Sequence, residues 1–162
     1  MQVVIRDGRP EEAAELEALQ RRASLVWDDQ RDALLEHPDA ISVPASLFDV
    51  GDVRVATDPD GRTVGFSVVL PSADDAAPEL DGLFVEPALQ GGRGIGRALV
   101  DDAAQVATGR GRSALWVIAN PNALAFYEKV GFVVTGEVAT RFGPGLRMRL
   151  DLVRSHAQRQ AR

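Results

Sequence analysis

The chain of 162 residues has no cysteine, which excludes disulfides, thiolate metal sites and a cysteine nucleophile. Its only histidines, His37 and His156, lie far apart in the sequence, so a zinc centre would depend almost entirely on carboxylates. No Gly-x-Ser-x-Gly segment is present, which argues against a familiar kind of serine nucleophile. The sequence therefore predicts no metal site.

Long apolar runs are also missing. The first three apolar residues, Val3 to Ile5, are followed at once by charges, which is too short a run for a signal peptide, and no later stretch could span a bilayer. We therefore expect a cytoplasmic protein that does not contact membranes.

Basic residues are the scarcer charge, with 18 Lys and Arg against 24 Asp and Glu and a net charge of −6. Nucleic-acid binders usually carry a basic patch that meets the phosphates. Nucleic acid is therefore not an expected partner, and the acidic balance mildly favours a cationic substrate such as an amine.

The length and composition fit one folded domain, which we place at residues 1–153, with a polar, flexible tail at 154–162. Apolar periodicity, turn residues and capping residues predict the elements. Strands are predicted at residues 3–6, 53–57, 63–70, 79–85, 113–118, 132–138 and 147–152. Helices are predicted at residues 10–23, 28–35, 94–107 and 122–130.

Within this order, Asp58 to Arg62 reads as the turn of a hairpin, Asn122 as the cap of a short helix, and Gly131 as its stop. The strand–helix–strand crossover in the middle implies one parallel pair, and the hairpins imply antiparallel neighbours. The predicted fold is α/β: a mixed, mostly antiparallel central sheet with one parallel pair and helices on both faces.

The most informative segment runs from Gln90 to Leu99 and reads QGGRGIGRAL, between a predicted strand and a predicted helix. Glycines let the backbone approach a ligand closely, and the first amides of a helix have no internal partner. Together with the helix dipole they favour a pyrophosphate, to which Arg93 and Arg97 could add charge.

A glycine-rich turn that only caps a helix is the alternative interpretation. Two other phosphate loops do not fit. A Walker loop needs Gly-Lys-Ser/Thr, which is absent, and a dinucleotide fingerprint needs an acid about 20 residues on. The residue twenty beyond Gly94 is Ala114, in a predicted strand.

A second motif follows at residues 120–132, which read NPNALAFYEKVGF. It resembles the signature of the GNAT superfamily of acetyl-CoA-dependent N-acetyltransferases: an Asn after the fifth strand, a short helix that bears Phe-Tyr, and a closing Gly-Phe. The glycine loop resembles that family's Arg/Gln-x-x-Gly-x-Gly/Ala loop at Gly91 to Gly96. The first position departs from the pattern, since it is Gly91, with Gln90 one residue earlier.

The resemblance covers residues 79–138, and the element order extends it over the whole chain. It implies that the loop amides hold the cofactor pyrophosphate, and that the preceding strand splays from the next one so that its backbone pairs with the pantetheine arm. Asn120 would bind the cofactor near the splay. The implied cofactor-binding residues are Leu83, Phe84, Val85, Gly91, Gly92, Arg93, Gly94, Ile95, Gly96 and Asn120.

The implied reaction is direct attack of a primary amine on acetyl-CoA, the co-substrate, in a ternary complex, accelerated mainly by positioning. Tyr127 would protonate the leaving thiolate as general acid. Glu79 and Asp81 are candidates for the base that deprotonates the ammonium, although a solvated strand end is the alternative.

The acceptor site is less defined. Trp27, Phe48 and the segment 141–145 are candidates by location, while Trp27 and Phe48 also fit the core. No extended charged groove is readable, which favours a small-molecule amine. Relatives often pair through sheet edges, so a homodimer is an open expectation. Two other functions stay open: a non-catalytic acyl-CoA-binding or sensor module, and an unrelated nucleotide-phosphate binder that uses the loop alone.

Overall fold

The computed structural model describes residues 2–25, 35–37, 39, 41–50, 52–71, 77–141 and 143–152. Its elements, in chain order, are β1 (Val4–Asp7), η1 (Pro10–Glu12), α1 (Ala13–Ser24), α3 (Leu47–Val50), β2 (Asp52–Thr57), β3 (Thr63–Leu70), β4 (Glu79–Val85), η3 (Pro87–Leu89), α4 (Ile95–Gly109), β5 (Ala114–Ala119), η4 (Pro121–Ala123), α5 (Leu124–Lys129), β6 (Val133–Thr140) and β7 (Gly143–Asp151). Most of the helix predicted at 28–35, Trp27 and the tail at 154–162 lie outside the described residues. Among the described helices, none is long and apolar enough to cross a membrane.

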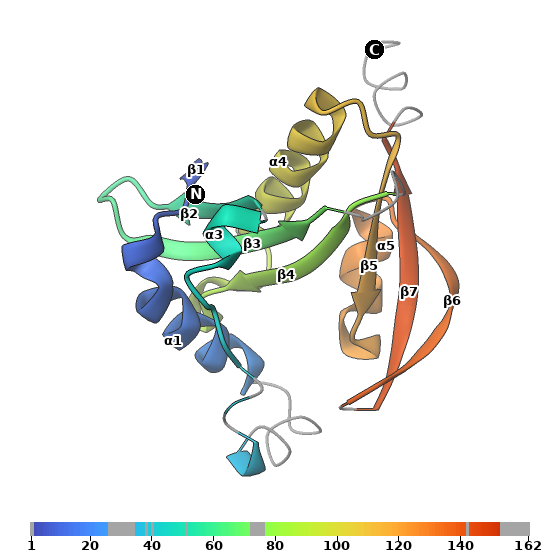
Figure 1. The fold of residues 1–162 in the computed structure, drawn as a ribbon, viewed down its shortest axis with the longest axis horizontal. Coiled ribbons are helices and arrows are strands. Elements are labelled where there is room, and N and C mark those ends of the chain that lie inside the picture. Colours follow the sequence, from blue (N-terminus) through green and yellow to red (C-terminus); the bar gives the residue numbers. More distant parts are fainter. Residues whose placement is uncertain are drawn as a thin grey trace. The chain divides into compact units, whose positions relative to one another are not determined.

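The strands form a seven-stranded sheet in the order β1-β2-β3-β4-β5-β7-β6 (Figure 1). β1 with β2, β5 with β7 and β6 with β7 are antiparallel, whereas β4 pairs with β5 in parallel. Among the described residues, the parallel pairing is confined to one register pair, Glu79 with Trp116. These pairings confirm the predicted mixed, mostly antiparallel α/β sheet with one parallel pair.

The chain divides into two compact units. Unit 1 comprises Met1–Val68 and Gly82–Leu99, and unit 2 comprises Val69–Asp81 and Val100–Arg162. That residues 1–153 act as one domain stays a prediction.

Unit 1 contains the predicted helix stripe and hairpin turn. Leu16, Leu19 and Ala23 on α1 are buried. In the turn between β2 and β3, the Asp58 carboxylate accepts the backbone N–H groups of residues 60 and 62, each at 2.9 Å. Gly61 adopts a φ of 83°, a conformation that glycine takes without steric cost.

The four-residue helix α3 was not predicted, because one turn is too short to show a helical period. Its Phe48 is half-buried, and a Cβ atom placed on Gly8 would lie 3.1 Å from the Phe48 ring. Phe48 therefore packs against the connection between β1 and α1.

Unit 2 buries one face of β5 and β7 and exposes the other. Leu115, Val117 and Ala119 on β5 are buried, as are Met148 and Leu150 on β7. The alternate residues of these strands are half-buried or exposed: Trp116, Ile118, Arg147 and Arg149. Since side chains alternate along a strand, these four lie on the opposite face, which we call the open face.

The start of the segment at 120–132 differs from the prediction. Asn120, not Asn122, is the cap: its side-chain oxygen accepts the backbone N–H of Asn122 at 2.9 Å and so begins η4, which leads into α5. Pro121 explains the difference, because proline suits the first helical position and places the cap one residue before it. The predicted stop is confirmed, since Gly131 has a φ of 107° and Phe132 N–H donates to the Tyr127 carbonyl at 2.9 Å.

Candidate active site

The glycine loop of unit 1 has a backbone that only glycines adopt without strain. Gly91, Gly92 and Gly94 have φ values of 81°, 89° and 77°. A Cβ atom added at any of the three would meet no atom within 4 Å. The protein itself therefore leaves room at this loop, and it is the backbone conformation, rather than crowding, that requires glycine.

Helix α4 begins directly after this loop. Its first helical hydrogen bond runs from Ala98 N–H to the Gly94 carbonyl at 3.0 Å, so the amides of residues 95–97 have no partner within the helix. Ile95 is buried against Ala56, Val64 and Leu99, which fixes the helix start. The result is a fixed group of amides at the positive end of a 15-residue helix, which suits a phosphate oxygen.

The end of β4 also belongs to unit 1. Leu83 and Val85 pack against the cluster that holds Ile95, and the Phe84 ring lies 5.3 Å from the Phe66 ring, centroid to centroid. The Gln90 side-chain amide donates to the Val85 carbonyl at 3.1 Å. The glutamine that precedes the loop therefore ties the loop back to the strand.

An ion pair that the sequence did not predict lies between α1 and the end of β4. The Arg22 guanidinium donates to both Glu86 oxygens, at 2.9 Å and 2.7 Å. Glu86 N–H also donates to the Val64 carbonyl at 2.9 Å. Arg22 and Glu86 lie 64 residues apart, so no local sequence pattern indicates that they are in contact. The sequence shows only that their charges are opposite.

In unit 2, Asn120 has one satisfied and one unsatisfied polar atom. Its oxygen caps η4, whereas its side-chain nitrogen is buried without a hydrogen-bond partner. An unpaired buried donor costs about 1–3 kcal/mol. An enclosed donor of this kind needs an acceptor from a ligand or a water, which fits the contact with the cofactor that the family resemblance implies.

Tyr127, the only tyrosine of the chain, lies on α5 and is 8% exposed. Its ring meets those of Phe126 and Phe132 edge-on, at centroid distances of 5.1 Å and 5.4 Å. Burial raises the pKa of the Tyr127 phenol to about 12. Within the described residues, the hydroxyl has no hydrogen-bond partner, so its proton is not committed to a protein acceptor.

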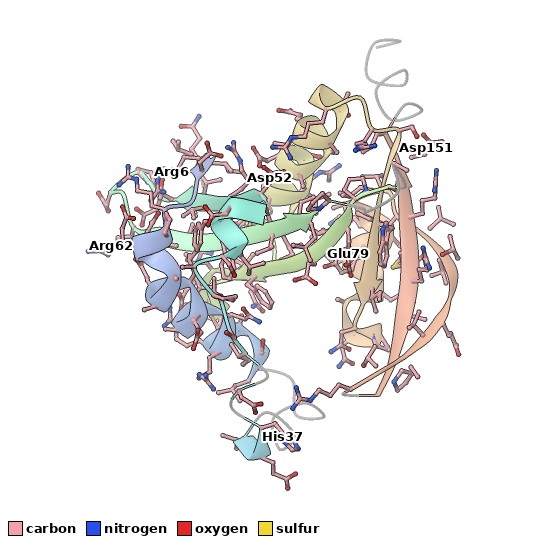
Figure 2. The ribbon with its side chains drawn as sticks, in the orientation of Figure 1. Arg6, His37, Asp52, Arg62, Glu79 and Asp151 are labelled. Carbon is pink, nitrogen blue, oxygen red and sulfur yellow. The ribbon has the colours of Figure 1, made fainter. Side chains whose placement is uncertain are left out.

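The two candidate bases lie at the start of β4, also in unit 2 (Figure 2, where Glu79 is labelled). Burial raises the pKa of Glu79; the negative charge of Asp81 raises it further, and the positive charge of Arg147 lowers it. Desolvation by the surrounding protein raises the pKa of Asp81, although its side chain is exposed. A carboxylate with a raised pKa is a stronger base than an ordinary one.

The open face supplies two further residues that the sequence did not indicate. The Arg147 guanidinium carbon lies 4.6 Å from the centroid of the Trp116 ring. The Trp116 indole N–H donates to the Ala77 carbonyl at 2.9 Å. Alternation along residues 143–151 could have shown that Arg147 faces outward, but not that it stacks on an aromatic ring.

The predicted site residues thus fall into two groups. The loop and the end of β4 are brought together in unit 1, and Tyr127, Asn120, Glu79 and Asp81 belong to unit 2. Among the described residues, no three His, Cys, Asp or Glu side chains gather as a metal site would require.

A family model described as an acetyltransferase (GNAT) domain matches residues 49–134, which is 86 of the 162 residues. No curated protein matches the sequence.

Several solved structures share the fold. A GCN5-related N-acetyltransferase from Rhodopseudomonas palustris is 25% identical with a TM-score of 0.75, covering 93% of this chain and 96% of that one. The PaiA N-acetyltransferase from Thermoplasma acidophilum, in complex with coenzyme A, is 17% identical with a TM-score of 0.73, covering 93% and 99%. A chimera of the spermidine N-acetyltransferase SpeG from Vibrio cholerae and hSSAT is 17% identical with a TM-score of 0.70, covering 95% and 98%.

The family match spans the glycine loop, the start of α4, Asn120 and Tyr127, which are the residues that the sequence predicts for the site. The structural neighbours share the mixed sheet over nearly the whole chain. This chain therefore belongs to the GNAT acetyltransferase family.

Proposed function

We propose that this protein is an N-acetyltransferase that moves the acetyl group of acetyl-CoA to a primary amine, in a ternary complex. The observation that carries the proposal is the loop at the start of α4. Three glycines with positive φ lead into unpaired helix amides, in a chain of the GNAT family. Backbone N–H groups at a helix start bind a diphosphate without needing a particular side chain, so the absence of Arg or Gln at position 91 does not weaken the site.

The chain offers contacts for the rest of acetyl-CoA as well. In the part of β4 and β5 that the structure describes, register pairing is limited to Glu79 with Trp116, which supports a pantetheine arm that pairs with the backbone of residues 83–85. The Val85 carbonyl already accepts from Gln90, so Leu83 and the remaining backbone groups carry this pairing. The unpaired Asn120 carboxamide N–H donates to a cofactor carbonyl. Arg93 and Arg97, both exposed, add positive charge near the loop.

Tyr127 acts on the departing sulfur. With a pKa of about 12, the phenol keeps its proton at neutral pH. A free thiol has a pKa of about 8.5, so the phenol is the weaker acid by about 3.5 pK units and complete transfer of its proton to a thiolate is unfavourable. Tyr127 therefore works as a hydrogen-bond donor to the sulfur while the carbon–sulfur bond breaks, which refines the general-acid role implied by the family.

Glu79, assisted by Asp81, removes a proton from the acceptor ammonium, since only the neutral amine attacks the carbonyl. The raised pKa values of both carboxyls suit this role. The acceptor is a small-molecule amine, which the spermidine N-acetyltransferase among the structural neighbours supports. Cytoplasmic location and acetyl-CoA as co-substrate belong to the same proposal.

The proposal is tested by incubating the protein with acetyl-CoA and a panel of primary amines while a thiol reagent measures free CoA. We expect amine-dependent CoA release, and CoA binding by calorimetry. The absence of both CoA release and CoA binding would refute the proposal. Tight CoA binding without transfer to any amine would instead identify a binding or sensor module.

A further inference from the structure

The open face of unit 2 carries opposite charges on strands that flank β5. Register places Glu79 beside Trp116, Trp116 beside Arg149, and Ile118 beside Arg147, so all of these side chains share one face. Asp81 follows Glu79 by two residues and lies on the same side of β4. The acids therefore stand on β4, the cations on β7, and an aromatic and an aliphatic side chain on β5 between them.

Arg147 is held toward the acids. The indole of Trp116 is fixed by its bond to the Ala77 carbonyl, and the Arg147 guanidinium rests on that ring. Cation–π contact of this kind stabilises one orientation of a long side chain. From β7, the guanidinium thus extends over β5 in the direction of β4, and its positive charge lowers the pKa of Glu79.

Arg147 nevertheless forms no ion pair with these acids. Among the described residues, no carboxylate oxygen forms an ion pair within 4.0 Å of Arg147. Its side chain is exposed. A stacked guanidinium keeps its planar fork of N–H donors for a carboxylate.

We propose that this face selects an acceptor amine that also carries a carboxylate a few bonds away, as an amino acid does, with Glu79 and Asp81 at the ammonium and Arg147 at the carboxylate. Adjacent strands lie about 4.8 Å apart. β5 lies between β4 and β7, so the backbones that carry the acids and Arg147 are about two strand spacings apart, and the guanidinium lies over the β5 ring between them. An α-amino acid with a hydrogen bond at each charged end is of the size that such a gap accepts. This inference rests on the proposed acetyltransferase function and names its acceptor class.

The test is steady-state kinetics with matched sets of acceptors: L-phenylalanine, L-phenylalaninamide and phenethylamine, and likewise L-arginine, L-argininamide and agmatine. We expect the carboxylate-bearing member of a set to have the highest kcat/KM. Arg147→Gln should raise its KM by about 10–100-fold, the range expected for loss of a charged hydrogen bond. The same variant should leave the KM of phenethylamine and agmatine within about twofold.

Arg149→Gln is the matched control, because it removes the same charge from the same strand and face but not from the Trp116 ring. It should behave like the wild type, and Arg147→Lys should recover part of the loss, since it restores charge without the fork. Circular dichroism melting checks that each variant is folded.

Three results would overturn the inference: the amides or decarboxylated amines react as well as the amino acids, Arg147→Gln weakens all acceptors equally, or Arg149→Gln causes the same selective loss. Any of these leaves the acetyltransferase itself intact. Failure of the underlying function looks different, because no amine would release CoA.

Discussion

Tyr127 combines a buried ring with a hydroxyl that has no described protein partner. Tyr127→Phe keeps the ring and its edge-on contacts, so the melting temperature should change little. If the hydroxyl donates to the sulfur in the transition state, kcat should fall about 10²–10³-fold. The dissociation constant for CoA, measured by calorimetry, should stay within about threefold. Equal turnover by the two proteins would contradict the role of the phenol.

The proposed role of Glu79 as base predicts how kcat/KM depends on pH. Its pKa is raised, so the acidic limb of the kcat/KM profile should lie above the ordinary glutamate value of 4.5. Glu79→Gln should abolish most of kcat/KM and remove that limb. Asp81→Asn is the comparison, since the variant that loses the limb identifies the base. A limb that persists unchanged in both would show that neither carboxyl is the base.

The same shift fixes the sign of the effect on stability. Between the unfolded and the raised folded pKa, the folded protein binds more protons, so the contribution of Glu79 to stability falls as pH rises through that window. Glu79→Gln should therefore be at least as stable as the wild type at pH 7, measured by urea unfolding. A clear loss of stability at pH 7 would mean that the carboxylate has a stabilising partner.

At the scale of elements, the loop and the hairpin turn offer a controlled comparison. Gly94 and Gly61 have φ values of 77° and 83°, and an added Cβ meets no atom within 4 Å at either position. Gly94→Ala and Gly61→Ala should each cost about 1–2 kcal/mol of unfolding free energy, because a positive φ strains alanine. Only Gly94→Ala should weaken CoA binding in calorimetry, by about tenfold or more, because it distorts the amides of the α4 start. Equal affinities in the two variants would remove the loop from the site.

The elements also show which signals were local. The stripe on α1, the Asp58 turn and the Gly131 stop could be predicted because each depends on residues within one or two turns of chain. The cap at Asn120 was placed two residues late, since the sequence offers two asparagines and the position of Pro121 decides between them. The helix α3 was missed because it is one turn long.

For the whole molecule, the two motifs sufficed to predict the family, since together they mark a loop and a short helix in a fixed order. The mixed sheet could be predicted from the order of the elements, because a strand–helix–strand crossover implies a parallel pair and hairpins imply antiparallel ones. The open face was different. The stacking of Arg147 on Trp116 and its influence on Glu79 depend on the register of three strands that lie far apart in the sequence. From the sequence alone, Arg147 is only one of several charged residues that are expected to face outward.

The central claim is that the backbone amides at the start of α4 hold the diphosphate of acetyl-CoA. Backbone amide chemical shifts, recorded by NMR as coenzyme A is titrated into ¹⁵N-labelled protein, test it most directly. We predict that the amides of Gly92, Gly94, Ile95 and Gly96 show the largest shifts and saturate together. Coenzyme A that binds while those amides stay unmoved, or that does not bind at all, would contradict the account.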